Sequence, residues 1–293
     1  MPLPKSYTPT GRNSRLLAPT PSSAPTPDSD PHPPAPPGGT DHPAPPGSGP
    51  GYADTFAADY DRWFGKPGIT GATVDALVGL SGTGPVLELG VGTGRIALAL
   101  SQRGIRVHGI DASEAMIRRL RDKPGGTEIT VHIGDFSHVD VPDRYSLIYL
   151  AGGTFFELAD TEAKQRCLAA ARARLKPGGL LVFDAHLPEA LAVASASGTP
   201  EVVAETDERL ILCHRRIDAS TQTYQSHYLI HEADRTRHLR VAFHYASPGE
   251  LDLMAHKAGL RLVRRQGTWA GAPFTRESAY HVSVYEIGAA EES

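Results

Sequence analysis

The 293-residue sequence contains few cysteines: Cys167 and Cys213 are its only two. Two thiols cannot build the disulfide framework of a small secreted domain or a cysteine-rich metal cluster. Cys167 also falls on the apolar side of a predicted helix, which is typical of a small core residue. The cysteine content therefore indicates a protein of the reducing cytoplasm, and no metal site is predicted.

The sequence also lacks a long hydrophobic run. No segment approaches the roughly 18 apolar residues that a membrane-spanning helix needs, and Leu16, Leu17 and Ala18 are far too short a run for a signal peptide. An excess of charge of one sign is missing as well, since 29 basic and 33 acidic residues are mixed throughout. We therefore expect no membrane partner, and no nucleic acid partner because phosphate binding needs a basic surface.

Residues 1–50 lack almost all of the apolar and aromatic side chains that a core requires. They hold sixteen of the 25 prolines, and Tyr7 is their one aromatic residue. Such a segment cannot bury enough apolar surface to offset the entropy cost of ordering it, so we predict a disordered tail. Residues 51–293 remain, which is enough for one domain with a large core.

The domain opens with an aromatic, amphipathic segment over 52–64 and a short helix over 70–80. Strands and helices then alternate, and this alternation predicts a parallel sheet with helices on both faces. The expected strands are Val86–Leu89, Ile105–Ile110, Glu128–Ile133, Tyr145–Leu150 and Leu180–Phe183, and the helices between them are 94–103, 113–122 and one capped by Asp160, followed by a turn at Lys176–Gly179.

A β-rich insertion over 188–246 is predicted after the fifth strand, because residues 200–246 show no helical period. Short connections there favour antiparallel pairing. Ser247 then opens a helix with a capping box, and two final strands, Leu260–Arg264 and His281–Ile287, follow it. The fold prediction is therefore an α/β, doubly wound, seven-stranded and mostly parallel sheet (Rossmann-like) with an antiparallel last strand.

The most informative motif follows the first strand of this sheet. Gly90, Gly92 and Gly94 recur at every second position between the strand and a helix. This arrangement brings bare backbone close to a nucleotide-like ligand. The same glycines would also let a strand pack tightly on its helix, so the motif alone leaves both interpretations open.

Two acidic residues at the next strand ends favour the ligand-binding interpretation. Asp111 ends the second strand, where a carboxylate can accept hydrogen bonds from both ribose hydroxyls. Asp135 follows the third strand and can accept from an exocyclic purine amine. The alternatives are a charge that favours the helix dipole for Asp111 and an ordinary Gly-Asp turn for Asp135.

Four motifs together resemble those of class I S-adenosylmethionine (SAM)-dependent methyltransferases of the small bacterial type. They are Glu88–Gly94 (ELGVGTG), Asp111, Gly134–Phe136 (GDF) and Leu175–Leu180 (LKPGGL). The resemblance covers about 52–187, extends to the closing strands by topology and does not include the proline-rich tail. It implies SAM as the cofactor and methyl transfer as the reaction.

The resemblance also implies roles for individual residues at a SAM site. The N-terminal aromatic segment would cover this site and make Tyr52, Tyr60 and Trp63 contacts, although core packing explains such a stripe equally well. The other implied ligands are Glu88, Gly90, Gly92 and Gly94 around the methionine part, Asp111 at the ribose, Ala112 and Met116 beside the adenine, Asp135 and Phe136 at the adenine edge, and Ala151 beneath the sulfonium.

Methyl transfer itself demands little beyond alignment of the reactants and exclusion of water. A base helps when the acceptor is a protonated amine or an alcohol. His186, just past the fifth strand, is the first candidate by position, and Glu157 is the second. A lone histidine more often makes a structural hydrogen bond, so the structural interpretation of His186 stays open.

The expected acceptor is a small molecule, methylated on N or O, with a secondary metabolite as one class, and the insertion is expected to roof its pocket. An NAD-dependent oxidoreductase is the main alternative, but its fingerprint is GxGxxG and this chain has GxGxG followed by Arg95. A non-catalytic SAM-fold binding protein is a third possibility, which the intact acidic positions oppose. Monomer and homodimer are both open.

Overall fold

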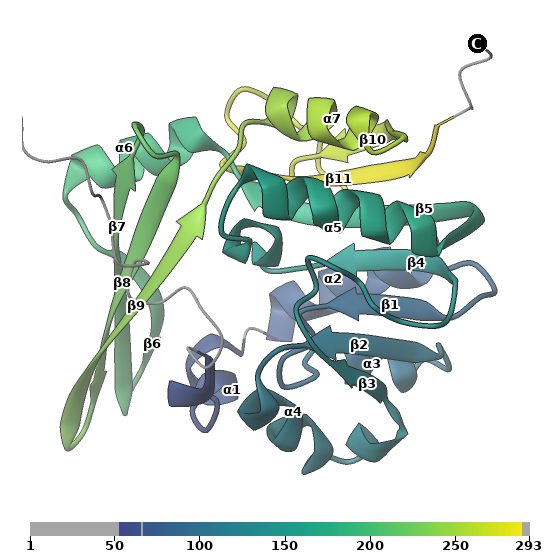
Figure 1. Cartoon of the computed structure of the whole chain (residues 1–293). Coiled ribbons are helices and arrows are strands. Elements are labelled where there is room, and N and C mark those ends of the chain that lie inside the picture. The colour runs from purple at the N-terminus through teal and green to yellow at the C-terminus, as the bar shows by residue number, and fades with distance from the viewer. Residues whose placement is uncertain (1–52, 66, 289–293) are drawn as a thin grey trace, which may run out of the picture. The chain divides into compact units, whose positions relative to one another are not determined.

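A computed structural model describes residues 53–65 and 67–288 of the chain. Within these residues a seven-stranded sheet has the strand order β10-β11-β5-β4-β1-β2-β3 (Figure 1). Its strands are β1 (Val86–Leu89), β2 (Val107–Asp111), β3 (Thr130–Ile133), β4 (Tyr145–Leu150), β5 (Leu175–His186), β10 (Leu260–Gln266) and β11 (Tyr280–Ile287).

Strands β1 to β5 pair in parallel, while β11 pairs antiparallel with both β5 and β10. The predicted doubly wound sheet with a reversed last strand is therefore confirmed. The strand order reverses between β1 and β4, and the carboxyl ends of such strands form the ligand crevice of this architecture. The glycine loop leaves the sheet at this point.

Successive side chains of each strand point to opposite faces of the sheet. Helices pack against both of these faces. Val86 packs with α2 (Pro67–Leu80), α3 (Ala97–Ser101) and Leu120 of α4 (Glu114–Arg121). Leu87 and Leu89 pack with α5 (Thr161–Arg174) and α7 (Pro248–Lys257) on the opposite face. In Figure 1, α5 lies on the near face of the sheet and α3 lies behind it.

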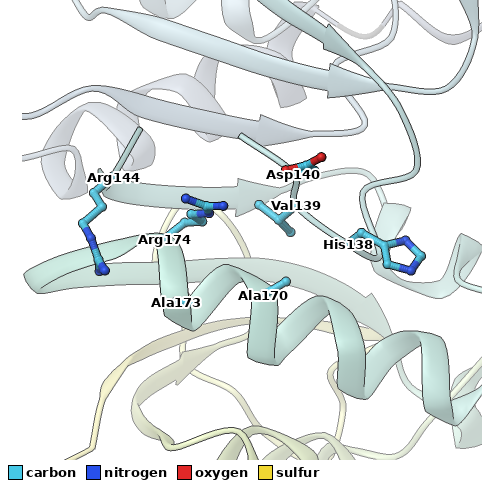
Figure 2. Close-up of a pocket in the computed structure, with 7 residues that line it drawn as sticks. All are labelled: His138, Val139, Asp140, Arg144, Ala170, Ala173 and Arg174. Atoms are coloured by element: carbon cyan, nitrogen blue, oxygen red, sulfur yellow. The ribbon is translucent and has the colours of Figure 1, made fainter. Parts of the chain in front are cut away.

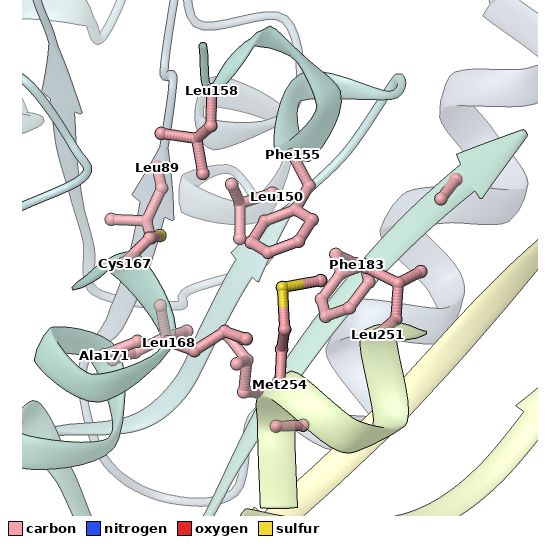
Figure 3. Close-up of a cluster of buried hydrophobic side chains, with 14 of the residues drawn as sticks. Leu89, Leu150, Phe155, Leu158, Cys167, Leu168, Ala171, Phe183, Leu251 and Met254 are labelled. Atoms are coloured by element: carbon pink, nitrogen blue, oxygen red, sulfur yellow. The ribbon is translucent and has the colours of Figure 1, made fainter. Parts of the chain in front are cut away.

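The larger apolar cluster fills the space beneath α5 and α7 (Figure 3). Phe183 of β5 stacks on Phe155 at 4.5 Å between ring centroids and on Tyr285 of β11 at 5.4 Å. Met254 and Leu168 close the cluster from the two helices. The buried Cys167 belongs to this cluster, as its apolar position in the sequence predicts.

A second, four-stranded antiparallel sheet follows β5 in the chain. Its order is β6-β7-β8-β9, with β6 (Glu201–Thr206), β7 (Arg209–Asp218), β8 (Thr223–Glu232) and β9 (Arg235–His244). The inserted segment begins with a helix, α6 (Pro188–Ser197), which the sequence analysis does not predict. Proline at its first turn and Gly198 at its end, with φ of 64°, are helix signals, but the alanine-rich run between them has little apolar periodicity.

Three predicted elements differ from the structure. Helix α3 begins at Ala97 rather than at Gly94, because φ of 77° at Gly94 is incompatible with a right-handed helix. Strand β5 starts at Leu175, and the predicted turn becomes an irregularity in its pairing with β4, with φ of 73° at Gly178. The segment over 52–64 forms two short helices, η1 (Ala53–Thr55) and α1 (Tyr60–Phe64).

Two predictions concern parts of the chain that lie outside the described residues. They are the disordered tail over 1–50 and the cofactor contact of Tyr52. Within 53–65 and 67–288, no helix combines the length and the apolar character needed to cross a membrane.

Candidate active site

The loop after β1 depends on three glycines with left-handed backbone. The φ angles of Gly90, Gly92 and Gly94 are 78°, 54° and 77°, which side chains with a Cβ rarely adopt. A Cβ on Gly90 would lie 2.6 Å from Thr154, and one on Gly94 would lie 2.8 Å from Leu120. A Cβ on Gly92 would meet nothing within 4 Å. Gly92 is thus the position where open space reaches the loop backbone.

Asp111 connects this loop to α4. Its Oδ2 accepts from the Gly92 N–H at 2.7 Å, and its Oδ1 accepts from the Ser113 N–H at 2.8 Å. Burial raises the pKa of Asp111, and these two backbone hydrogen bonds oppose the shift. A carboxylate has about four lone-pair sites, so Asp111 retains capacity to accept from ligand hydroxyls.

A buried carboxyl lies beside the loop at Glu88, which is 5% exposed. The Tyr149 hydroxyl donates to its Oε2 at 2.8 Å, and burial raises the pKa of Glu88 to about 8. Burial likewise raises the pKa of Tyr60 to about 12. The charge of Arg95 opposes both shifts, and its guanidinium donates to Thr70 Oγ1 at 2.6 Å. Arg95 therefore brings a positive charge to the space near Glu88 and Tyr60.

Two aspartates of the N-terminal segment bind the glycine loop and the start of α4. Asp61 of α1 accepts from the Thr93 hydroxyl at 2.6 Å and pairs with Lys123 at 2.6 Å. Asp54 of η1 accepts from the hydroxyl of Ser113 at the start of α4. These contacts hold α1 against the glycine loop and η1 against the start of α4.

Trp63 and Met116 lie in a different environment from that of Glu88. Trp63 is 3% exposed, donates its indole N–H to Glu232 at 3.3 Å and has the Arg237 guanidinium 5.3 Å from its ring. Met116 is buried in the same apolar cluster, together with Phe56. This cluster joins α1 and α4 to the four-stranded sheet, so the structure uses both side chains in packing.

The end of β3 lies beside the end of β2, since the Gly134 N–H donates to the Asp111 carbonyl at 3.0 Å. Asp135 is exposed there and accepts from the backbone N–H and the hydroxyl of Ser137, both at 2.8 Å. Phe136 is partly buried against the main core, and Ala112 is exposed. Asp135 and Ala112 are thus brought to the same edge of the sheet as Asp111.

The loop after β4 is held by a carboxylate from β5. Asp184 accepts from the Gly152 N–H at 3.2 Å, the Gly153 N–H at 2.8 Å and the Trp269 indole at 2.8 Å. The half-buried Ala151 precedes this pair of glycines. Asp184 therefore fixes the position of the loop that leads into η3 (Thr154–Glu157).

Glu157 ends η3 and has a solvent-accessible side chain. The surrounding protein nevertheless desolvates its carboxylate and raises its pKa to about 7, and the negative charge of Asp111 adds to the shift. The charge of Glu157 in turn contributes to the raised pKa values of Tyr60 and Tyr224, in both of which burial is the main cause. Glu157 therefore shares one electrostatic environment with the predicted ribose ligand and with Tyr60.

His186, the other candidate base, ends β5 in a different environment. Its half-buried ring lies 6.3 Å from the Tyr280 ring. Burial and then the charge of Arg215 in β7 lower its pKa, so the imidazole is neutral at neutral pH. The structure thus places His186 where the charge of Arg215 of the four-stranded sheet acts on it.

A fully buried lysine connects η3 to the four-stranded sheet. Lys164 of α5 is 0% exposed, and its Nζ donates to the Leu158 carbonyl at 2.9 Å and to His244 Nδ1 at 3.0 Å. Burial lowers the pKa of Lys164 to about 7. Since Leu158 directly follows Glu157, Lys164 positions the end of η3 relative to β9.

A surface depression of about 620 Å³ lies between the end of α5 and the segment from His138 to Arg144, which leads from the end of β3 to the start of β4. Figure 2 shows Arg144 and Arg174 at one end of it and His138 at the other. Arg144 directly precedes β4, whereas the ligand crevice of a parallel sheet lies at the carboxyl ends of its strands. We therefore do not assign the active site to this depression.

Four residues of the candidate site were not predicted from the sequence: Arg95, Tyr149, Asp184 and Lys164. Asp184 carried a usable signal, because it lies near the carboxyl end of a predicted strand. Tyr149 and Lys164 carried none, since one occurs in an apolar strand and the other on a polar-looking helix turn. Their partners lie 61 and 80 residues away, and sequence spacing does not show such contacts.

Comparison with known proteins identifies the class of this fold and site. A family model described as a methyltransferase domain matches residues 86–179. The structure of the CcbJ methyltransferase from Streptomyces caelestis is 35% identical, with a TM-score of 0.74 over 81% of this chain and 98% of that chain. The chain belongs to the SAM-dependent methyltransferases, and its cofactor is SAM.

Two further relatives agree with this assignment. The cypemycin N-terminal methyltransferase of a Streptomyces species is 28% identical over 69% of this chain and 82% of its own length. SAM-bound CalS10 from Micromonospora echinaspora, an amino pentose methyltransferase, is 20% identical with a TM-score of 0.57, over 78% of this chain and 96% of that chain, and shares the fold. These findings exclude the NAD-dependent oxidoreductase and the non-catalytic protein.

The glycine loop offers a direct test of where SAM binds. Replacing Gly92 with Ala should cost roughly 1–2 kcal/mol of stability through its left-handed backbone alone and should also weaken binding of S-adenosylhomocysteine. Replacing Gly90 with Ala should destabilise the fold further, because its Cβ would overlap Thr154. Chemical denaturation and titration calorimetry measure the two effects separately.

Gly104→Ala is the matched control for the Gly92 variant. Gly104 has φ of 78° and open space around its Cβ position, but it lies before β2, at the opposite end of that strand from Asp111. It should lose similar stability while binding S-adenosylhomocysteine normally. Equal affinities for the Gly92 and Gly104 variants would contradict the assignment of the loop.

The buried lysine predicts a specific pH dependence of stability. The pKa of Lys164 is about 7 in the fold and 10.5 ordinarily, so the unfolded chain binds more protons between these values. The contribution of this group to the unfolding free energy must then rise with pH, by up to about 1.4 kcal/mol per pH unit. Relative to Lys164→Met, the wild-type protein should gain stability between pH 7 and pH 9.

Denaturation curves recorded across this pH range provide the measurement. Lys257→Met is the control, because the Lys257 ammonium is exposed and donates to Gln165 at 3.5 Å. It should leave the pH profile of the wild-type protein unchanged. Parallel profiles for wild type and Lys164→Met would show that Lys164 keeps an ordinary pKa in the fold.

Proposed function

We propose that this enzyme transfers the methyl group of SAM to a nitrogen atom of a small-molecule acceptor, with Glu157 as the general base. The observation that carries this proposal is the position of Glu157 at the end of η3, in the loop after β4, where the charges of Glu157 and Asp111 interact and its pKa is raised. A base whose pKa lies near the working pH is the most effective.

The chemistry of the acceptor follows from the strength of this base. An α-ammonium group has a pKa of roughly 7.7–8.0, so a carboxylate of similar basicity can take its proton and free the nitrogen lone pair before the bond to carbon forms. An alcohol holds its proton far more tightly, and its methylation would require a stronger base. The name of the cypemycin N-terminal methyltransferase supports an amine acceptor and a natural-product setting.

The proposed SAM site uses the residues that the structure gathers at the strand ends. Gly92 leaves open space against the loop backbone, and this space supports the fit of SAM to the site. Glu88, with Gly90 and Gly94 shaping the loop, and Arg95 provide polar and charged groups for the amino-acid end. The remaining proposed contacts are Asp111 at the ribose, Ala112, Asp135 and Phe136 at the adenine, and Ala151 and Tyr60 at the sulfonium.

The residues of the chain have three tasks in the reaction. When bound, SAM supplies a methyl group on a sulfonium that leaves as a neutral thioether. Glu157 would take the proton of the acceptor ammonium and so free the nitrogen lone pair for the methyl group that bound SAM would supply. Tyr60 and α1 exclude water, and Asp184 keeps the loop before Glu157 in place. The buried thiols of Cys167 and Cys213 support a cytoplasmic setting.

Replacing Glu157 with Gln tests the proposed base. We expect kcat/KM to fall by about 10²–10⁴-fold, with little change in SAM affinity, because glutamine keeps the shape but cannot accept the proton. In the wild-type protein kcat/KM should rise with pH through about 7, and the variant should lose this rise. Labelled SAM, a panel of amines with their alcohol counterparts, and product mass spectrometry supply the readout.

Glu162→Gln is the matched control for this experiment, since Glu162 is an exposed carboxyl in the first turn of α5. Its kinetics should match those of the wild-type protein. Wild-type turnover by Glu157→Gln would remove Glu157 as the base, and methylation of the alcohols but not the amines would contradict the proposed acceptor.

A further inference from the structure

One face of the four-stranded sheet is apolar at both of its ends. At one end, Ile211 and Ile230 are paired across β7 and β8 and are fully buried in the cluster that holds α1. At the other end, Tyr224 and Phe243 stack at 4.7 Å between ring centroids and pack against the main core. If this face served only to pack against α1 and the main core, β7 and β8 would carry apolar side chains between these two ends as well.

On β7 and β8 the middle of this face is polar instead, whereas β9 places Leu239 and Val241 beside it. Every second residue of a strand points to the same face of the sheet. Cys213 and Arg215 therefore share the face of Ile211, and Ser226 and Tyr228 share the face of Ile230. The register pairs Cys213 with Tyr228 and Arg215 with Ser226. We call these four residues the polar strip. On these two strands the strip lies between the two apolar ends, and Tyr228 also contacts Phe64 of α1 at 5.1 Å between ring centroids.

Arg215 supplies the positive charge of the strip. Burial raises the pKa values of Cys213 and Tyr228, which keeps the thiol and the phenol neutral. The Arg215 side chain is 16% exposed, and its NH1 pairs with Glu201 at the start of β6, whose side chain is 54% exposed. A guanidinium has five N–H donors, so one carboxylate at its NH1 leaves donor capacity for a ligand.

The charge of Arg215 acts on two groups, His186 and Tyr224. It lowers the pKa of His186 at the end of β5, after burial as the main cause. It also acts on the Tyr224 hydroxyl, on which the negative charge of Glu157 acts with the opposite sign. Tyr224 thus lies within the electrostatic range of both Arg215 and the proposed base.

We propose that Arg215 is an acceptor-binding residue and that it holds a carboxylate of the acceptor while the acceptor amine lies at Glu157. The assignment rests on the proposed function and adds the acceptor class to it: an amine that also carries a carboxylate. The planar fork of arginine matches two carboxylate oxygens. The pair with Glu201 orients the guanidinium, and a partly buried ion pair of this kind contributes little to stability by itself.

Acetate, acetamide and inorganic phosphate serve as probes of this site. Each is titrated, at constant ionic strength, into the protein saturated with S-adenosylhomocysteine, and the Arg215 side-chain N–H signal is followed by NMR. Acetate should shift this signal saturably and more strongly than phosphate, and neutral acetamide should not. Calorimetry measures the affinity for acetate. Arg215→Met should weaken acetate binding at least about tenfold, whereas Arg215→Lys should keep part of this affinity.

Arg216→Met is the matched control, because Arg216 is the next residue on β7, exposed and on the opposite face. It should bind acetate like the wild-type protein. No saturable shift with acetate, equal shifts with acetamide, or stronger binding of phosphate would each overturn the proposal. Acetate binding involves no methyl transfer and should persist in Glu157→Gln, so failure of the proposed base is distinguishable from failure of the Arg215 assignment.

Discussion

The carboxylate of Asp111 is the group on which the geometry of the site depends. One oxygen holds the glycine loop through Gly92, and the other holds the start of α4 through Ser113. The backbone carbonyl of the same residue receives the Gly134 N–H at the end of β3. Three segments therefore meet at one residue, and any ligand hydroxyl bound there is placed relative to all of them. A buried acceptor satisfied in this way rigidifies the structure around it.

The N-terminal segment connects the glycine loop and α4 to the four-stranded sheet. Asp61 binds the glycine loop and Asp54 binds the start of α4, whereas Asp59 pairs with Arg237 of β9 at 2.7 Å. Trp63 adds an apolar anchor beneath that arginine. These contacts tie the proposed cofactor site and the sheet that carries Arg215 to the same few residues. Loss of one anchor should therefore disturb binding of both substrates, not only of SAM.

The main sheet was predictable because its signals are local. Apolar runs such as Val86–Leu89 and the capping box at Ser247 determine their elements from a few adjacent residues, and the structure keeps both. The wrong element bounds occur where a glycine adopts a backbone conformation that the composition does not predict. Gly94 delays α3 by three residues, and Gly178 allows β5 to continue through the expected turn. Glycine marks both places, but the sequence does not say which left-handed conformation it will adopt.

The site was predictable to the extent that it is built from strand ends. Asp111, Asp135 and Glu157 all follow strands of the main sheet, so topology brings them to one edge. Arg215 and Arg216 show the limit of this reasoning, because both occupy one strand of an antiparallel sheet. A shift of one residue in register would exchange their faces. The observed pairing of Arg215 with Ser226 and of Arg216 with Gln225 settles the choice, and it depends on the whole length of β7 and β8 rather than on either arginine. The proposed cofactor half of the site can thus be inferred from motifs, whereas the proposed acceptor half requires the register of the inserted sheet.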